Sequence, residues 1–216
     1  MVLISLNNFS KSFGSKKVFS RANFFVNRGE VLGVVGPSGS GKSVLIKIII
    51  GFFLPDRGVL VNNSLSHSVG FSLQSNPLYD NLTVYQNLKY FGKVNNIPPK
   101  VIHSRISSLL GSLSLNDYSK VLVRNLSGGT KKRVDIACAL ITDPEVVVLD
   151  EPFLGLDPLL VNSLSEFILS LKGSGKTIII SSHRVPELSK VCSRMVLVKN
   201  NLIYDINKSQ VLDAYG

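Results

Sequence analysis

The chain has 216 residues, of which 44% are hydrophobic and 18% charged, and this composition suits one well-packed globular domain. The formal net charge of +10 admits a nucleic acid, an anionic membrane surface or an anionic small ligand as a partner. The charge selects none of them, because the basic residues are spread thinly, with a single tight run at Lys131–Arg133 and no interleaving with aromatic residues. The longest apolar run, Val44–Leu54, contains Lys47 and is too short to cross a bilayer.

The two cysteines do not indicate a metal site. Cys138 and Cys192 lie far apart and lack the spacing of metal ligands. Each belongs to an apolar helical pattern, so we expect both to be reduced residues of the core.

The N-terminal third is predicted to be rich in strands. A polar loop is expected at Lys11–Lys17, and turns at Asn27–Glu30 and Pro55–Gly58. The expected strands are Val2–Phe9, Val18–Val26, Val59–Asn62 and Val69–Leu73. They flank Val31–Val35, whose continuous apolar character is typical of a buried parallel strand. An antiparallel layer is therefore expected beside a parallel core.

A phosphate-binding loop follows the strand at Val31–Val35. Gly36–Ser43 matches the pattern G-x-x-x-x-G-K-[ST], and the apolar stretch after it predicts a helix that Gly51 and Pro55 end. Glycines allow consecutive backbone N–H groups to face an anion, and the helix start adds partial positive charge. Lys42 is expected to reach the β- and γ-phosphates, and the Ser43 hydroxyl to bind Mg²⁺. Kinases, GTPases and motor ATPases share this loop, so alone it predicts only nucleoside triphosphate binding.

The middle of the chain is predicted to be helical. Apolar residues recur at helical spacing from Asn81 to about Leu122, with a break at Asn95–Pro99. A Gly-Gly turn after Asn125 and a helix from about Lys131 to Ile141 follow. We interpret these apolar stripes as helix core.

The C-terminal third alternates strands with helices. Strands are predicted at Val146–Leu149, Thr177–Ser181 and Met195–Val198, with helices near Leu159–Leu171 and Pro186–Val191. This alternation is typical of a parallel α/β sheet. The predicted class is therefore α/β, with a P-loop parallel-sheet core beside an antiparallel β layer.

Polar residues follow several of the predicted strands at their carboxyl ends, where open α/β sheets bind ligands. Asp150 is placed to hold Mg²⁺ directly or through water, and Glu151 to orient or deprotonate an attacking water. An ordinary acidic strand end is the alternative. His183 and Gln74 also follow strands, and for each of these two residues spacing supports a phosphate-site role and a structural role equally.

A second anion-binding helix start is predicted at Leu126–Thr130. Ser127 is expected to cap the following helix, with the glycines exposing its N-terminal N–H groups. One chain thus holds two phosphate-type sites. Either it binds two anions, or one site completes the site of a neighbouring chain.

Over essentially its whole length, the chain resembles the ATP-binding-cassette (ABC) ATPases, the nucleotide-binding subunits of ABC transporters. The motifs follow the family's order: P-loop, Gln74, Leu-Ser-Gly-Gly, Asp150-Glu151, Gly155-Leu156-Asp157 and His183. The segment Asn76–Leu88 resembles the branch that contains drug and polysaccharide exporters. The resemblance implies a single domain over 1–216, with the core and β layer at about 1–75 and 140–216 and an inserted helical subdomain at about 76–139.

The resemblance also implies a role for each matching residue. Phe13 would stack on adenine, and Gln74 would contact Mg²⁺ and respond to the membrane partner. Asp150 would support Mg²⁺, Glu151 would act as catalytic base, His183 would hold the γ-phosphate, and Asp157 would couple two sites. Ser127, Gly128 and Gly129 would contact ATP bound by the other protomer. The implied ATP-binding loop comprises Gly36, Pro37, Ser38, Gly39, Ser40, Gly41, Lys42, Ser43 and Val44.

Several positions depart from the family pattern. Thr130 stands where the signature usually ends in Gln, and its shorter side chain is expected to weaken the contact across a dimer. Val44 replaces a hydroxyl residue often used on the α-phosphate, and Phe153-Leu154 replaces small polar residues. Lys42, Glu151 and His183 are retained, so ATP hydrolysis is expected.

The leading hypothesis is a Mg²⁺-dependent ATPase that drives a separate transmembrane permease subunit. It would act as a homodimer, or as a heterodimer with another ABC ATPase, at the cytoplasmic face of a membrane. A non-transport ABC ATPase acting on a nucleic-acid or assembly machine is the alternative, although the chain lacks the second cassette or long inserts typical of that class. A third hypothesis, motivated by Thr130 and Val44, is a cassette that binds ATP without turnover.

Overall fold

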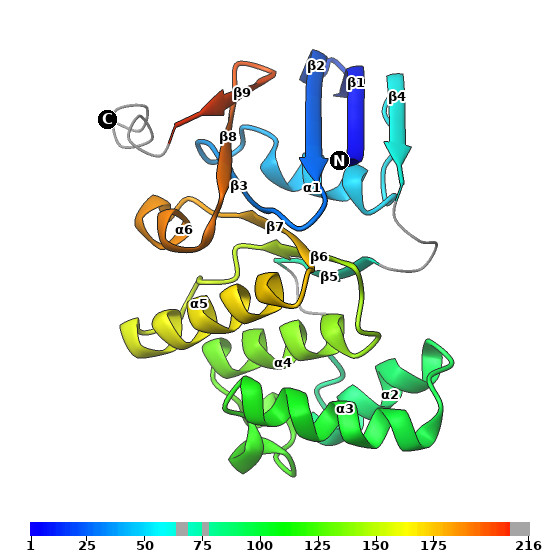
Figure 1. The fold of residues 1–216 in the computed structure, drawn as a ribbon, viewed down its shortest axis with the longest axis vertical. Helices are drawn as coiled ribbons and strands as arrows, with labels where there is room; N and C mark the ends of the chain where they lie inside the picture. Colours follow the sequence, from blue (N-terminus) through cyan, green and yellow to red (C-terminus); the bar gives the residue numbers. More distant parts are fainter. Residues whose placement is uncertain (64–68, 75–77, 208–216) are drawn as a thin grey trace.

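The computed structural model describes residues 1–63, 69–74 and 78–207, which form two β-sheets and the helices around them (Figure 1). The strands of the described part are β1 (Val2–Phe13), β2 (Lys16–Asn27), β3 (Val31–Val35), β4 (Arg57–Asn62), β5 (Val69–Ser72), β6 (Val146–Asp150), β7 (Thr177–Ser181), β8 (Arg194–Lys199) and β9 (Leu202–Ile206). Its α-helices are α1 (Lys42–Ile49), α2 (Val84–Val94), α3 (Pro99–Ser112), α4 (Gly128–Leu140), α5 (Pro158–Gly173) and α6 (Val185–Val191).

The smaller sheet is antiparallel and has the order β2-β1-β4. The polar loop predicted at Lys11–Lys17 is wrong, because β1 continues to Phe13 and β2 begins at Lys16, leaving only Gly14 and Ser15 as the turn. Gly14 has a φ of 57°, the left-handed conformation that a tight turn needs and that glycine adopts without strain. The strands continue through these polar residues because one face of the hairpin is exposed to solvent, where polar side chains are tolerated.

The larger sheet has the order β5-β6-β7-β3-β8-β9, and its strands are parallel except for the β8–β9 pair. The parallel core is therefore confirmed. The strand predicted at Val69–Leu73 exists as β5, but it joins this sheet rather than the antiparallel layer. Strand β9 was not predicted, because its residues are only partly buried and it is an edge strand.

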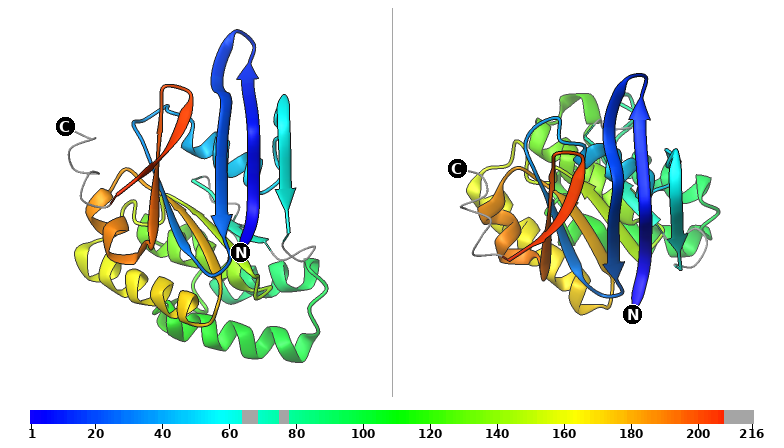
Figure 2. Two further views of the ribbon diagram at one scale, coloured as in Figure 1. Left: turned by 45° about the horizontal axis from the view of Figure 1, so that its top comes forward. Right: turned by 90° about the horizontal axis from the view of Figure 1, so that it is seen from above.

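Helix α1 lies between the two sheets, and most other helices cover the opposite face of the larger sheet (Figures 1 and 2). Alternation along β6 shows why: Val146 and Val148 pack with α1, whereas Val147 and Leu149 pack with the core that contains α4 and α5. All five residues of β6 are buried, as expected for a parallel strand covered on both faces.

Local signals define the helix starts. Helix α2 begins with a capping box in which the side chains of Thr83 and Gln86 each bond the backbone of the other. The Gly-Gly turn predicted before Lys131 is wrong, because Gly128 and Gly129 already form the first turn of α4, which Ser127 caps as predicted. The two glycines have little intrinsic helix propensity, but the Ser127 cap and tertiary packing override it.

Cys138 and Cys192 are buried and neither forms a disulfide, as predicted. Within residues 1–63, 69–74 and 78–207, no helix is both long and apolar enough to span a membrane.

Candidate functional site

The predicted phosphate loop connects β3 to α1, with Gly41 at the N-cap of the helix. Two of its glycines are required by close packing. A Cβ on Gly36 would lie 2.4 Å from the carbonyl oxygen of Val198, and one on Gly41 would lie 2.8 Å from Val18 Cγ1. Gly41 also has a φ of 114°, which side-chain-bearing residues rarely adopt. The loop therefore passes tightly over β8 and the hairpin.

Two polar groups of the loop are arranged for an anion. The Lys42 ammonium folds across the loop and donates to the carbonyl oxygens of Gly36, at 2.7 Å, and Pro37, at 3.1 Å. Burial lowers the pKa of Lys42, and the nearby carboxylates of Glu151 and Asp150 oppose this shift. The Ser40 hydroxyl is buried and has no hydrogen-bond partner among the described residues. A bound phosphate would give this hydroxyl a partner.

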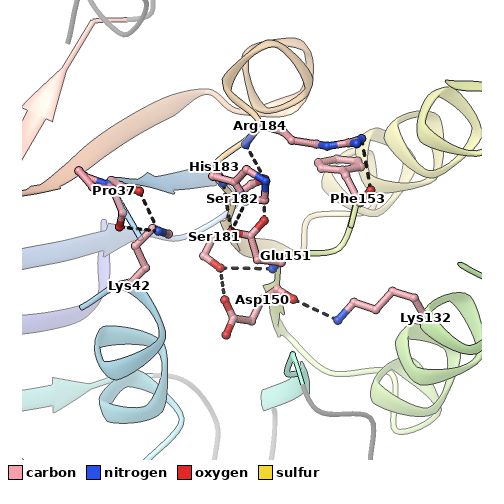
Figure 3. A network of polar contacts seen from close by, with 11 residues as sticks. Pro37, Lys42, Lys132, Asp150, Glu151, Phe153, Ser181, Ser182, His183 and Arg184 are labelled. Atoms are coloured by element: carbon pink, nitrogen blue, oxygen red, sulfur yellow. Dashed lines mark hydrogen bonds and ion pairs between the residues drawn. The ribbon is translucent and has the colours of Figure 1, made fainter. Parts of the chain in front are cut away.

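The carboxyl ends of β6 and β7 bring Glu151 and His183 together (Figure 3). Glu151 Oε1 lies 3.0 Å from His183 Nδ1 and accepts a hydrogen bond from the His183 backbone N–H at 3.1 Å. The Ser182 hydroxyl donates to the other oxygen, Oε2, at 3.0 Å. Both oxygens of the predicted catalytic base are thus already engaged by the segment that carries His183.

The backbone of Glu151 is held in a conformation that is uncommon for a non-glycine residue, with a φ of 52°. Its N–H donates to the carbonyl oxygen of Ser181 at 3.0 Å, which holds the residue against the end of β7. Such outliers cluster at functional sites, where the surrounding structure maintains them. Asp150, one residue earlier, is buried, and its carboxylate accepts a hydrogen bond from the Ser181 hydroxyl.

Most of the predicted nucleotide residues line one cleft of about 760 Å³, whereas Gly36, Pro37 and Ser40 lie outside its lining. Phe13, at the end of β1, forms one wall and packs edge-to-face on Phe53, with ring centroids 5.2 Å apart. The predicted residues found in the lining are Phe13, Ser38, Gly39, Gly41, Lys42, Ser43, Val44, Gln74, Glu151 and His183. Lys16, Val18 and Leu154 also line the cleft, although sequence reasoning had not assigned them to it.

The predicted signature and coupling residues lie outside this lining. Ser127 and Gly128 are exposed at the start of α4, and Asp157 is exposed at the start of α5. The two helix starts are neighbours, because a Cβ on Gly129 would lie 3.1 Å from the carbonyl oxygen of Gly155. Asp157 Oδ1 accepts from the N–H groups of Leu159 and Leu160, both at 3.0 Å. It therefore acts as the N-cap of α5.

Thr130, one of the departures from the family pattern, is buried and forms hydrogen bonds with other residues of α4 and its cap. Its hydroxyl lies 2.9 Å from Ser127 Oγ and accepts from Arg133 Nη2 at 3.3 Å. Arg133 also donates to the carbonyl oxygens of Leu113 and Ser114, beyond the end of α3. Through Arg133, Thr130 therefore links the start of α4 to the segment that follows α3.

Sequence reasoning missed Ser181, Ser182 and Lys132. The serine hydroxyls hold the two carboxylates from the end of β7, and Lys132 contacts the strand ends from α4. The adjacent Ser181-Ser182 pair before His183 was an available signal, because hydroxyls at the carboxyl end of a buried strand face the ligand side. Lys132 offered no such signal, because it lies in a run of three basic residues, Lys131–Arg133.

Residues 19–154 match the family model described as "ABC transporter". The chain belongs to this family. Similar curated proteins include "Nod factor export ATP-binding protein I" of Ralstonia nicotianae, 33% identical over 92% of this chain and 64% of the relative. "Lipopolysaccharide export system ATP-binding protein LptB" of Haemophilus influenzae is 30% identical over 92% of this chain and 87% of the relative.

This ABC-family chain spans less than two thirds of several of those relatives, covering 64% of the Ralstonia protein and 61% of its Sinorhizobium fredii counterpart. Solved structures similar to it include "Structure of ATP binding subunit of ABC transporter", with a TM-score of 0.86, 26% identity and coverage of 99% of this chain and 94% of that one. The "ADP conformation of MJ1267, an ATP-binding cassette of an ABC transporter" has a TM-score of 0.85, 27% identity and coverage of 100% and 95%. The α/β cassette fold is thus confirmed.

The residues of the cleft fit Mg²⁺ held together with a nucleotide. Ser43 and Gln74 of the lining offer oxygen donors, which this ion prefers, and Asp150 offers a carboxylate that is buried at the end of β6, outside that lining. Among the residues that the structure describes, no group of three or more His, Cys, Asp or Glu side chains forms a self-sufficient metal site. Proteins usually bind Mg²⁺ through one or two carboxylates, waters and substrate phosphates.

Proposed function

We propose that this cassette hydrolyses ATP in a Mg²⁺-dependent reaction and powers transport through a separate membrane subunit. The observation that carries the proposal is the single cleft in which the phosphate loop, Gln74, Glu151 and His183 meet. The unpartnered Ser40 hydroxyl and the inward-facing Lys42 ammonium support a triphosphate as the ligand.

The residues divide the chemical work. The phosphate loop and Lys42 bind the β- and γ-phosphates, and Phe13 packs on the base. Glu151 accepts a proton from the attacking water at a carboxylate oxygen, and His183, now 3.0 Å from that carboxylate, contacts the γ-phosphate. Mg²⁺, held by Ser43 and Asp150 with support from Gln74, supplies positive charge that offsets charge on the phosphates.

The exposed start of α4 supports head-to-tail pairing of two cassettes. Ser127, Gly128 and Gly129 lie outside the cleft of their own chain, although a helix start suits phosphate binding. Each ATP would be held by Lys42 of one chain and by the α4 start of the other. ATP favours the closed pair because only that state makes both sets of contacts, and hydrolysis removes the difference.

The partner is a transmembrane permease, contacted by the helices within residues 84–125, and the cassette binds at the cytoplasmic face of the membrane. Relatives named for Nod factor export and lipopolysaccharide export support an exporter. The exporter-like segment Asn76–Leu88 points the same way, although residues 76 and 77 lie outside the described ranges.

Turnover tests the chemistry. Glu151→Gln should bind ATP but hydrolyse it about 100-fold or more slowly, since it loses the general base. The measurement is phosphate release by purified protein, with Lys42→Ala as the background. Wild-type release no higher than that background would instead favour a cassette that only binds ATP.

Co-purification tests the partner. The tagged chain is isolated from detergent-solubilised membranes of its native host, and the proteins that accompany it are identified. A polytopic membrane protein in near-equal amount supports the transporter. Ribosomal or DNA-associated proteins alone would favour the soluble alternative.

A further inference from the structure

We propose that Lys132 is a positioning residue that holds together the backbone segments carrying Gln74 and Glu151 and joins them to the start of α4. The inference rests on the proposed function of the cleft and adds a residue to it. Lys132 lies on α4 and is buried, with a side chain only 8% exposed. Figure 3 shows it reaching the strand end from the side opposite to Lys42.

The Lys132 ammonium bridges two strands at the point where they separate. The β5–β6 ladder ends at the pair Ser72 and Leu149. One residue further along each strand, Lys132 Nζ donates to the carbonyl oxygen of Leu73 at 2.9 Å and of Asp150 at 3.0 Å. The next residues in the chain are Gln74 and Glu151, so one ammonium sets the spacing from which both functional side chains project.

A second set of contacts holds this ammonium in place. Asp135, one helical turn after Lys132, lies 3.8 Å from it and is almost fully buried. The Ser72 hydroxyl of β5 donates to the same Asp135 carboxylate at 2.5 Å. Helix α4 is therefore attached to β5 through Asp135 and to both strand ends through Lys132. A buried ammonium needs such partners. Lys132 donates to the carbonyl oxygens of Leu73 and Asp150, which directly precede the functional residues.

This arrangement connects the two phosphate-type sites of one chain. Ser127 at the start of α4 faces the nucleotide of the other protomer in the proposed dimer, while Lys132, on the next turn, holds the strand ends of its own site. A displacement of α4 on closure is passed directly to Gln74 and Glu151. Losing the link should lower turnover while leaving nucleotide binding by the phosphate loop intact.

The test compares Lys132→Met with Lys131→Met. Methionine keeps the apolar stem and removes the ammonium. The neighbouring Lys131 is a matched control because its side chain is 27% exposed and pairs with Asp80 at the surface. Lys132→Met should lower kcat about tenfold or more with KM nearly unchanged, because small misplacements of catalytic groups are costly. Lys131→Met should match wild type, and Lys132→Arg should restore part of the rate.

A second readout does not depend on hydrolysis. Hydrogen–deuterium exchange of nucleotide-free protein should quicken in Lys132→Met at peptides containing Leu73 and Asp150, and not in Lys131→Met. If phosphate release by wild-type protein does not exceed the Lys42→Ala background, the proposed ATP hydrolysis is contradicted. Hydrogen–deuterium exchange alone then decides whether Lys132 has the positioning role.

Three outcomes overturn the positioning role: an unchanged kcat, a KM that rises in proportion as kcat falls, or unchanged exchange at both strand ends. Should Lys132→Met not fold, Lys132→Gln decides the same question, since its amide can serve at most part of the bridge. A reduced kcat at constant KM then supports the role, and an unchanged kcat overturns it.

Discussion

At the scale of single residues, burial shifts the pKa of two charged groups that lie outside the cleft lining, Asp135 and Lys132. Asp135 has its pKa raised from the ordinary 3.8 to about 6, because burial disfavours the carboxylate more than Ser72 and Lys132 favour it. Lys132 has its pKa lowered by burial, against the opposing influence of Asp135, Asp150 and Glu151. Both partners therefore lose part of their solvation to keep α4 attached to the sheet.

The raised pKa of Asp135 predicts a pH-dependent stability. The folded state binds the Asp135 carboxyl proton more tightly than the unfolded state does. The contribution of this proton to the free energy of unfolding is therefore fully present below about pH 4 and is lost as pH rises through about 6. Relative to Asp135→Asn, wild-type protein should lose on the order of 1 kcal/mol of unfolding free energy between pH 5 and pH 7.5. Urea unfolding of both proteins at the two pH values measures this, and equal pH dependence in the two proteins would contradict it.

At the scale of secondary-structure elements, helix starts recur at functional positions. Helix α1 starts from the phosphate loop, α4 from the signature serine and α5 from Asp157. A helix start requires polar partners for its free N–H groups. The same groups can bind phosphate, as proposed for α1, or a side chain of the loop before the helix, as in α5.

The cap of α5 gives a stability prediction separate from coupling. Asp157→Ala should lower the unfolding free energy by about 1 kcal/mol, because Leu159 and Leu160 lose the acceptor for their N–H groups. Asp157→Asn keeps a capping oxygen and should stay close to wild type. Denaturant titration distinguishes them, and a neutral Asp157→Ala would show that the cap adds little to stability.

At the scale of the whole molecule, the two predicted phosphate-type sites lie on separate surfaces. The cleft lies between the two sheets and the strand ends, whereas the exposed start of α4 lies outside the lining of this cleft. A single chain therefore does not bring Ser127 to its own cleft, and this supports the proposed head-to-tail pairing.

The pairing gives a prediction for solution mass. Glu151→Gln with Mg²⁺-ATP should double in mass, as measured by light scattering after size-exclusion chromatography, because unhydrolysed ATP holds the closed state. Ser127→Arg in the same background should stay monomeric, since a long side chain would occupy the phosphate position. A monomer in both cases would argue against the ATP sandwich.

The sequence by itself determined the family, the parallel core and most of the residues that line the cleft. These depend on local patterns: the spacing of glycines in the phosphate loop, apolar runs such as Val146–Leu149, and the order of short motifs along the chain. Each reflects backbone geometry or hydrophobic burial within a few residues, so it can be recognised without the fold.

Only the tertiary structure decided which distant residues support these motifs. The place of β5 in the parallel sheet depends on its pairing with β6, a strand far away in the sequence. The extent of the hairpin through Lys11–Lys17 and the edge strand β9 depend on pairing with a neighbouring strand. Ser182 holds Glu151, and Lys132 bridges Leu73 and Asp150, only because three strand ends and one helix converge. A basic run has no sequence signal that separates a buried lysine from its exposed neighbour, because packing between elements makes that choice.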